Sequence, residues 1–255
     1  MMWTDDNLKS YLSLSNENVF VKILKSRKYI DKTGLLSILN KYLGTADNCI
    51  CVSRPRRFGK SFNAAMINAY YSKCVNAVKL FAGLKIAESP DYLNELNRHN
   101  VICFDINQEI SFNGGTENFL ENIQKRIIAE LNAQYAITFS KNNLPAALNE
   151  INLRFGERFI VVIDEWDAIF RDHPDEQKLQ EDYVNMLSDL FKGLNSESFI
   201  ELAYLTGIFP IKMYDRRSSL INFRDYSILT PAESAPFFGF TGDEVESICG
   251  TFNLD

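Results

Sequence analysis

At 255 residues the chain is long enough for one large α/β domain, or for one such domain with a small appendage. Hydrophobic residues make up 46% of it, and the formal net charge of −6 argues against a surface dedicated to coating nucleic acid, although a local basic patch stays open as a nucleic-acid contact. No stretch approaches the length that crosses a membrane, and the acidic N-terminus lacks the apolar core of a signal peptide, so we expect a cytoplasmic protein without membrane contact.

The first segment, residues 1–19, is polar, and we expect it to be loosely attached. Residues 21–29 alternate apolar and polar side chains, which indicates a short strand or hairpin. A helix is predicted over residues 34–42, closed by Gly44 in the way that glycines end helices.

Residues 49–70 carry the motif on which the interpretation depends. A short apolar run, residues 49–52, predicts a buried strand; a basic loop and Gly59-Lys60-Ser61 follow, and then apolar residues recur at helical spacing. This order is the context of a phosphate-binding loop, in which backbone N–H groups and the helix N-terminus hold an anion. Lys60 would reach the β- and γ-phosphates, and the Ser61 hydroxyl would ligate Mg²⁺.

The loop departs from the general pattern, because Arg54 stands where a glycine is expected and Pro55 removes one N–H donor. Arg54, Arg56 and Arg57 would neutralise phosphate, lie along nucleic acid or form an exposed basic face. The alternative interpretation is that Gly59-Lys60-Ser61 occurs here by chance and is not part of a phosphate loop. The strand before it, the helix after it and an acidic partner favour a phosphate loop.

The rest of the chain alternates between helical and strand patterns, which predicts a parallel sheet covered on both faces. A polar linker around Gly114 and Gly115 separates the second strand from the next helix, and Thr241 with Glu244 forms the capping box of a last helix, at which the chain stops. The other elements that we expect are short helices in 73–99 (with a start signal at Ser89), helices over 117–134, 144–155 and 179–190, and strands over 101–106, 158–163, 200–205 and 226–229.

Asp164 and Glu165 follow an uninterrupted apolar strand, as the acidic partner of a phosphate loop does. Parallel strands end at one edge of a sheet, so Asp164 and Ser61 are expected to meet across one Mg²⁺, with Glu165 orienting or deprotonating a water. The alternative is a pair of solvated carboxylates. Thr206, at the end of the following strand, either senses the γ-phosphate or only forms a turn.

Two further clusters of residues give weaker indications of function. Arg216 and Arg217 would supply a charge-stabilising arginine, but surface exposure is the better interpretation. Residues 174–178 contain the residue types of a Mg²⁺-dependent nuclease, but they are adjacent in one polar loop, so they do not form such a site. Five cysteines lie mostly in apolar runs, which is typical of core thiols in a reducing compartment, and neither histidine has the spacing of a zinc ligand.

With these motifs in view, the sequence resembles the AAA-ATPase-like family of bacterial proteins, which often carry a C-terminal restriction-endonuclease-like domain that is absent here. Trp166 and Ala168 depart from the residues usual in the family. The resemblance covers roughly residues 20–250 and rests on residues 29–34, 54–61, 162–167, 205–208 and 238–241.

The resemblance implies a three-layer P-loop NTPase with a mostly parallel five-stranded sheet of order 5-1-4-3-2, a short N-terminal strand/helix extension and a truncated C-terminal helical region. It implies boundaries at 1–19 (polar segment), 20–232 (ATPase-like domain) and 233–255 (start of a helical lid). It also implies ATP and Mg²⁺ as cofactors, with Lys60, Glu165 and Thr206 as catalytic residues and Ser61 and Asp164 as metal ligands. The cofactor-binding set is Asp31, Lys32, Arg56, Arg57, Phe58, Gly59, Lys60, Ser61 and Phe62.

The expected function is ATP binding with hydrolysis to ADP and phosphate, coupled to an unidentified protein partner, to an oligomer or to a conformational change. The alternative is a nucleotide switch or interaction module without turnover. A small-molecule kinase is a third interpretation, but no acceptor pocket is recognisable in the sequence.

Overall fold

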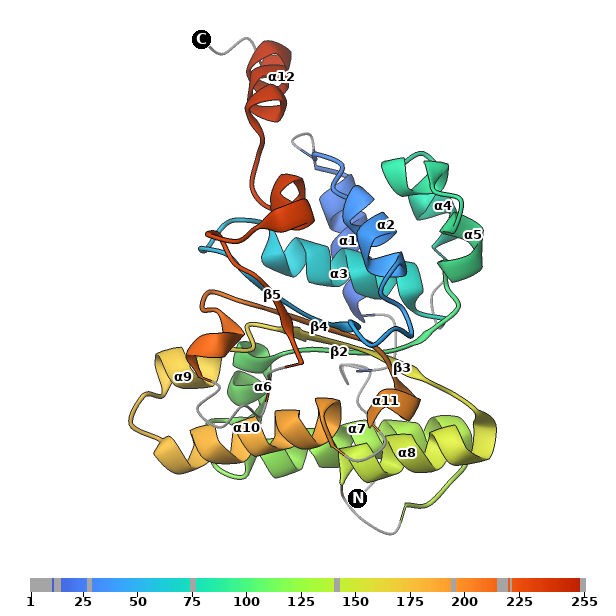
Figure 1. The fold of residues 1–255 in the computed structure, drawn as a ribbon, viewed down its shortest axis with the longest axis vertical. Coiled ribbons are helices and arrows are strands. Elements are labelled where there is room, and N and C mark those ends of the chain that lie inside the picture. The colour runs from blue at the N-terminus through green and yellow to red at the C-terminus, as the bar shows by residue number, and fades with distance from the viewer. Residues whose placement is uncertain are drawn as a thin grey trace.

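The computed structural model describes residue 11 and residues 15–26, 29–73, 77–139, 143–193, 196–214, 220 and 222–252. These residues form three layers, with a five-stranded sheet in the middle and helices on both of its faces (Figure 1). The expected three-layer α/β architecture is therefore confirmed.

The sheet has the order β2-β3-β4-β1-β5, and every neighbouring pair is parallel. This confirms the order 5-1-4-3-2, in which β4 separates the phosphate-loop strand from the acidic strand. The last strand lies two residues earlier than predicted and overlaps the expected 226–229 only at Tyr226. The strands are β1 (Cys49–Ser53), β2 (Asn100–Asp105), β3 (Phe159–Asp164), β4 (Ile200–Gly207) and β5 (Arg224–Tyr226).

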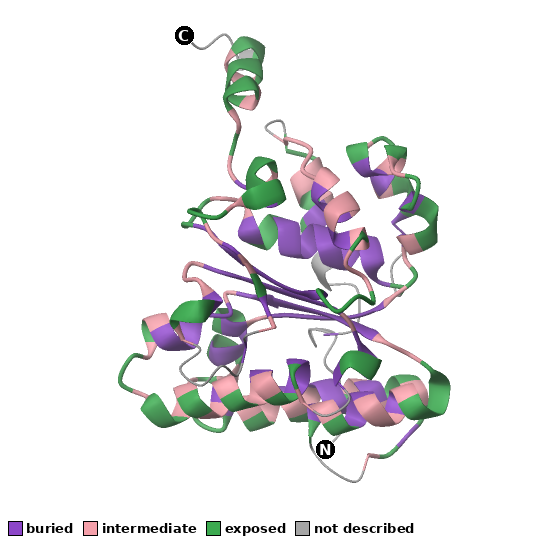
Figure 2. Cartoon of the chain, viewed as in Figure 1, coloured by how far each residue is buried: buried purple, intermediate pink, exposed green. Residues whose placement is uncertain are grey.

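Side chains alternate along the strands between two separate cores, one on each face of the sheet. The strands between the two helix layers are mostly buried (Figure 2). On β3, Val161 and Ile163 pack into one core and Ile160 and Val162 pack into the other. Both faces are apolar because both are covered, which is why these strands appear in the sequence as unbroken apolar runs. Cys49 and Cys51 are buried and free, as predicted.

Helices from the first part of the chain cover one face of the sheet, and those from the middle cover the other (Figure 1). The first group comprises α1 (Ser15–Leu24), α2 (Gly34–Asn40), α3 (Lys60–Tyr71), α4 (Val78–Phe81), η1 (Lys85–Glu88) and α5 (Tyr92–Glu95). The second comprises α6 (Ile106–Asn113), α7 (Phe119–Tyr135), α8 (Leu144–Phe155), α9 (Ala168–Asp172), α10 (Gln177–Phe191) and α11 (Ser196–Phe199). The chain then continues through η2 (Ile211–Met213), β5, η3 (Ala232–Phe237) and α12 (Gly242–Phe252).

Three predictions about local structure are wrong. The N-terminal extension holds no strand over its described residues, because residues 21–24 of the segment predicted as a strand or hairpin belong to α1, which packs on α3. The helix predicted to reach residue 42 ends at Asn40. The predicted polar linker after β2 begins instead with α6, whose first turn is capped by Asp105, because its carboxylate accepts a hydrogen bond from the Gln108 N–H (2.9 Å).

The polar N-terminal segment is anchored at Tyr11, which is buried. Its hydroxyl donates a hydrogen bond to Glu109 (2.6 Å), and its carbonyl accepts one from the N–H of Cys103 on β2 (3.1 Å). At this residue the chain is attached to the sheet, contrary to the expectation of a loose segment.

At the other end, the predicted capping box is formed. The Thr241 N–H donates to the Glu244 carboxylate (2.8 Å), and the Glu244 N–H donates to the Thr241 hydroxyl (3.3 Å). The helix that follows, α12, has 11 residues and stands away from the body of the molecule (Figure 1). None of the helices in the described residues is long and apolar enough to span a membrane.

Candidate functional site

The loop between β1 and α3 forms a concave backbone surface at the C-terminal edge of the sheet. Gly59 caps α3 with a φ of +80°, and a Cβ built on it would meet no atom within 4 Å. Arg57 also has a positive φ, +71°, which a non-glycine residue adopts at a cost. The open space and the N-terminus of a 12-residue helix together suit an anion.

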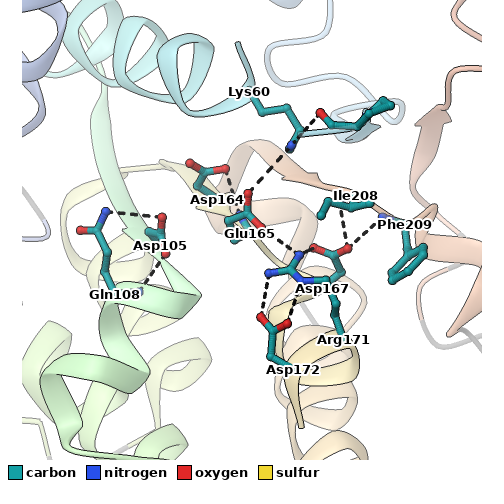
Figure 3. A network of polar contacts seen from close by, with 11 residues as sticks. Lys60, Asp105, Gln108, Asp164, Glu165, Asp167, Arg171, Asp172, Ile208 and Phe209 are labelled. Carbon is teal, nitrogen blue, oxygen red and sulfur yellow. Dashed lines mark hydrogen bonds and ion pairs between the residues drawn. The ribbon is translucent and has the colours of Figure 1, made fainter. Parts of the chain in front are cut away.

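Lys60 starts α3 and is only 5% exposed. Its ammonium donates a hydrogen bond to the Pro55 carbonyl (3.3 Å) and lies 3.9 Å from Glu165 Oε1 (Figure 3). A buried ammonium favours an anionic partner, and this one faces the concave loop surface.

Asp164 lies at the end of β3, where it meets the first turn of α3. The Ser61 hydroxyl lies near enough to this carboxylate to lower its pKa, so the two predicted magnesium ligands lie close together. Burial raises the pKa of Asp164 to about 7, and the nearby carboxylates of Asp105 and Glu165 act in the same direction. The site therefore concentrates carboxylate groups where a divalent cation would relieve the cost of their charge.

Glu165 follows directly, in a left-handed conformation with φ of +49°. Its Oε2 accepts a hydrogen bond from Arg171 Nη1 at 2.9 Å (Figure 3). The same Nη1 lies 3.3 Å from Asp167 Oδ1, and the rest of the guanidinium binds both oxygens of Asp172 (2.8 and 3.0 Å). Glu165 thus lies between two cations, Lys60 and Arg171.

Thr206 stands opposite Asp164 in the register of β3 and β4, and it is fully buried. Its Oγ1 has no hydrogen-bond partner among the described residues. A buried hydroxyl without a partner is costly, and it marks the end of β4 as a place where a ligand oxygen or a water would be bound. The next residue must be glycine, because a Cβ on Gly207 would lie 2.5 Å from Asp167 Oδ1.

A cavity of about 730 Å³ adjoins the loop, a size typical of small-molecule sites. The loop and the start of α3, residues 56–63, line it together with Glu165. Phe62 and Phe240 on its wall remain 57% and 60% exposed and offer flat aromatic surfaces. The remaining wall, contributed by α1, its following segment, Met66 of α3 and the C-terminal segment, is largely apolar and includes Phe20, Ile23, Tyr29, Ile30 and Phe237.

The structure separates the three arginines of the loop. Arg56 and Arg57 are exposed and line the cavity. Arg54 is different, and the expectation that it meets phosphate or nucleic acid is wrong: it is 3% exposed, and its Nη1 donates to the carbonyls of Ser53 (2.8 Å) and Tyr226 (2.6 Å).

The Arg54 guanidinium also donates to the Ser234 hydroxyl (3.2 Å) and stacks 5.0 Å from the ring centre of Phe238. The arginine that replaces the usual glycine therefore fastens the phosphate loop to the C-terminal segment. Phe58 and Asn63 add to this attachment, since the Phe58 carbonyl accepts from the Gly239 N–H (3.0 Å) and the Asn63 side chain donates to the Phe237 carbonyl (3.0 Å).

Asp31 and Lys32 differ in their position. Lys32 lines the cavity, but its ammonium is bound to Glu244 of the capping box (2.6 Å) and to the Pro236 carbonyl (2.7 Å). Asp31 is not among the cavity-lining residues; its carboxylate accepts hydrogen bonds from the Thr33 hydroxyl (2.6 Å) and from the Lys85 N–H (2.7 Å), which orders the start of α2.

Sequence reasoning assigned no role to Asp105, Asp167 or Arg171. Asp105 ends β2 as Asp164 ends β3, and this strand-end position is a signal that could have identified it. Asp167 belongs to the quoted acidic motif, whereas nothing in the local sequence marks Arg171. The predicted pair Arg216 and Arg217 lies outside the described residues.

The residues present fit a nucleoside triphosphate with Mg²⁺. The loop backbone leaves open space for an anion, Lys60 is buried beside it, and the unpartnered Thr206 hydroxyl lies at the neighbouring strand end. Within the described part of the chain, no three His, Cys, Asp or Glu side chains form a metal-binding cluster. Mg²⁺ bound through one carboxylate, one hydroxyl and phosphate oxygens does not need such a cluster.

Comparison with known proteins agrees with this geometry. A protein-family model described as AAA-ATPase_like, Predicted AAA-ATPase, matches residues 18–215, about three quarters of the chain. The match includes the phosphate loop, the acidic end of β3 and all of β4. A search of curated proteins finds no match to the chain.

Proposed function

The chain belongs to the Predicted AAA-ATPase family, and on this premise we propose that it binds ATP with Mg²⁺ and hydrolyses it to ADP and phosphate. The observation that carries the proposal is the proximity of Ser61 to Asp164, beside a cavity that Lys60, Ser61 and Glu165 line. These side chains lie at or after the ends of β1 and β3, two strands that are not adjacent in the sheet, and their convergence at one edge suits a triphosphate.

In this proposal the loop backbone and Lys60 hold the β- and γ-phosphates, and Arg56 and Arg57 add positive charge at the rim. Ser61 and Asp164 hold the metal ion, which when bound neutralises charge on the phosphate oxygens. The apolar wall and the exposed rings of Phe62 and Phe240 suit the base.

Glu165 is the candidate base for the attacking water. Its Oε1 faces Lys60, and hence the position of the γ-phosphate, while its Oε2 is bound by Arg171. A carboxylate oriented in this way would align a water and accept its proton as the water attacks phosphorus. The Thr206 hydroxyl would donate its hydrogen bond to the γ-phosphate or to that water.

A nucleotide switch without turnover is the second candidate, and the attachment of the C-terminal segment to the phosphate loop favours it. Arg54, Phe58 and Asn63 all bind residues of the segment 234–239. A nucleotide that shifts the loop would therefore shift this segment and α12 with it. We place either activity in the cytoplasm, with a protein partner or a second copy of the chain as the recipient of the change.

Glu165→Gln separates the two candidates. For an ATPase we expect ATP affinity to stay within about threefold of wild type, while the turnover rate falls at least about 100-fold. The measurements are equilibrium binding of ATP with Mg²⁺ and steady-state release of phosphate. The exposed Glu246→Gln serves as the matched control and should leave both unchanged. Wild-type protein that binds ATP but releases no phosphate would favour the switch.

A further inference from the structure

We infer that Arg171 is a positioning residue for Glu165, and that it links the orientation of this carboxylate to the end of β4, where Thr206 lies. The inference rests on the proposed ATP hydrolysis and assigns a role to a residue outside the phosphate loop and outside the acidic pair. It follows from which partner each carboxylate oxygen of Glu165 and of Asp167 contacts.

The two oxygens of Glu165 have different partners. Oε2 accepts from Arg171 Nη1 at 2.9 Å, whereas Oε1 points to Lys60 Nζ, 3.9 Å away (Figure 3). By binding one oxygen, Arg171 turns the other toward the phosphate loop. Glu165 also has a φ of +49°, a conformation that persists only where its surroundings hold it.

Arg171 is itself fixed in place. Its side chain is 13% exposed, and Asp172 binds it through two hydrogen bonds, Nε to Oδ1 at 3.0 Å and Nη2 to Oδ2 at 2.8 Å. Its Nη1 is shared between Glu165 and Asp167, which is fully buried. A planar guanidinium bound on both sides has little freedom to swing, so it fixes the direction of the Glu165 carboxylate.

Asp167 connects this pair to β4. Its Oδ2 accepts from the backbone N–H groups of Ile208 (2.9 Å) and Phe209 (2.8 Å), which directly follow the strand. Its Oδ1 faces Arg171 (3.3 Å). The contacts therefore run from the strand end through Asp167 and Arg171 to Glu165, and a ligand that moves the end of β4 would reorient the base.

Arg171→Gln tests the inference directly, because glutamine cannot make the shared ion pair. We expect kcat for ATP hydrolysis to fall at least about tenfold, while the Kd of ATP stays within about twofold. Arg171→Lys keeps the positive charge but lacks the planar set of N–H donors of the guanidinium, so it should give an intermediate kcat. Arg158→Gln is the control: it removes another partly buried arginine, paired with Glu201, at the opposite end of β3.

Asp167→Asn is the more selective variant. Its carbonyl oxygen can keep both backbone hydrogen bonds now made by Oδ2, while its amide replaces Oδ1 and repels Arg171. We expect unchanged ATP affinity and a several-fold lower kcat. This variant decides the question if Arg171→Gln does not fold.

Several results would overturn the inference: wild-type kcat in Arg171→Gln and Asp167→Asn, a higher kcat in either, or a loss no greater than that of Arg158→Gln. In these cases wild-type hydrolysis, and so the proposed function, would stand. Wild-type protein that binds ATP without turnover would overturn both proposals, because no base would then need positioning.

Discussion

Asp164 carries an electrostatic cost that its position explains. It is buried at the end of β3, with Asp105 opposite it on β2 and Glu165 next to it, and its pKa is raised to about 7. The Ser61 hydroxyl offsets only part of this. In the absence of a cation, the folded protein therefore holds a proton on Asp164 more tightly than the unfolded chain does.

This shift predicts a pH dependence of stability. Because the pKa is higher in the folded state, the charge of Asp164 costs no stability below about pH 4; the cost grows between about pH 4 and pH 7 and is constant above that. The stability that Asp164→Asn gains over wild type should therefore be larger at pH 8 than at pH 5, by about 3 kcal/mol. Urea unfolding in metal-free buffer at both values measures it. A gain that is equal at both pH values, or that also appears in the exposed Asp175→Asn, would contradict the account.

A second prediction for a single residue concerns Arg54. Its replacement by methionine leaves the carbonyls of Ser53 and Tyr226 without their donor, and it removes the stacking on Phe238. We expect a loss of about 2–3 kcal/mol in the free energy of unfolding. The exposed Arg56→Met should cost less than about 0.5 kcal/mol but weaken ATP binding. Equal stability losses in the two variants would contradict the assignment of Arg54 to structure.

The different roles of Arg54 and Arg56 could not be predicted from the sequence. Arg54 and Arg56 look alike in the sequence, and a basic cluster beside Gly-Lys-Ser predicts phosphate contacts for both. Which one turns inward depends on β5 and the segment 234–238, which lie about 170 residues away in the chain. Arg171 escaped prediction for the same reason, because its role depends on partners that only the fold brings together.

At the scale of elements, one prediction concerns the C-terminal segment. Lys32 binds Glu244 and the Pro236 carbonyl, so it attaches the capping box of α12 to the start of α2. Without this ammonium the helix loses an anchor. Lys32→Ala should therefore be cleaved several-fold faster at Phe240, which is exposed, by a protease that cuts after aromatic residues.

The exposed Lys41→Ala is the control for this experiment and should be cleaved at the wild-type rate. Glu244→Gln, which removes the partner charge, should behave like Lys32→Ala. Cleavage at the wild-type rate in both variants would show that the contact does not hold the segment.

Strong periodicity decided which elements the sequence predicts well. The unbroken apolar run of β3, the four-residue repeat of α7 and the capping box at Thr241 and Glu244 each have one physical interpretation, and all three are confirmed. The pattern of residues 21–29 predicts a strand or hairpin, but its first four residues belong to α1, because a short apolar run fits both periods. The short α6 has no clear apolar repeat, and it forms because Asp105 caps it.

At the scale of the molecule, the order of the strands creates the site. β1 and β3 both pair in parallel with β4, so the phosphate loop and the acidic pair emerge at one edge, on either side of Thr206. The alternation of the sequence predicts a parallel sheet, whereas the order of its strands follows from the resemblance of several motifs to the family. Neither source predicts the Asp167–Arg171–Glu165 contacts, which depend on how the start of α9 meets the residues that follow β4.

The central claim is that Lys60, Ser61 and Asp164 converge on one Mg²⁺-bound triphosphate, and equilibrium ATP binding with and without Mg²⁺ tests it most directly. We expect wild type to bind more tightly with Mg²⁺, and Lys60→Ala to weaken binding at least about 100-fold. Lys73→Ala, which removes an exposed lysine paired with Glu157 away from the loop, should bind as wild type does. Equal affinity in wild type and Lys60→Ala would contradict the account.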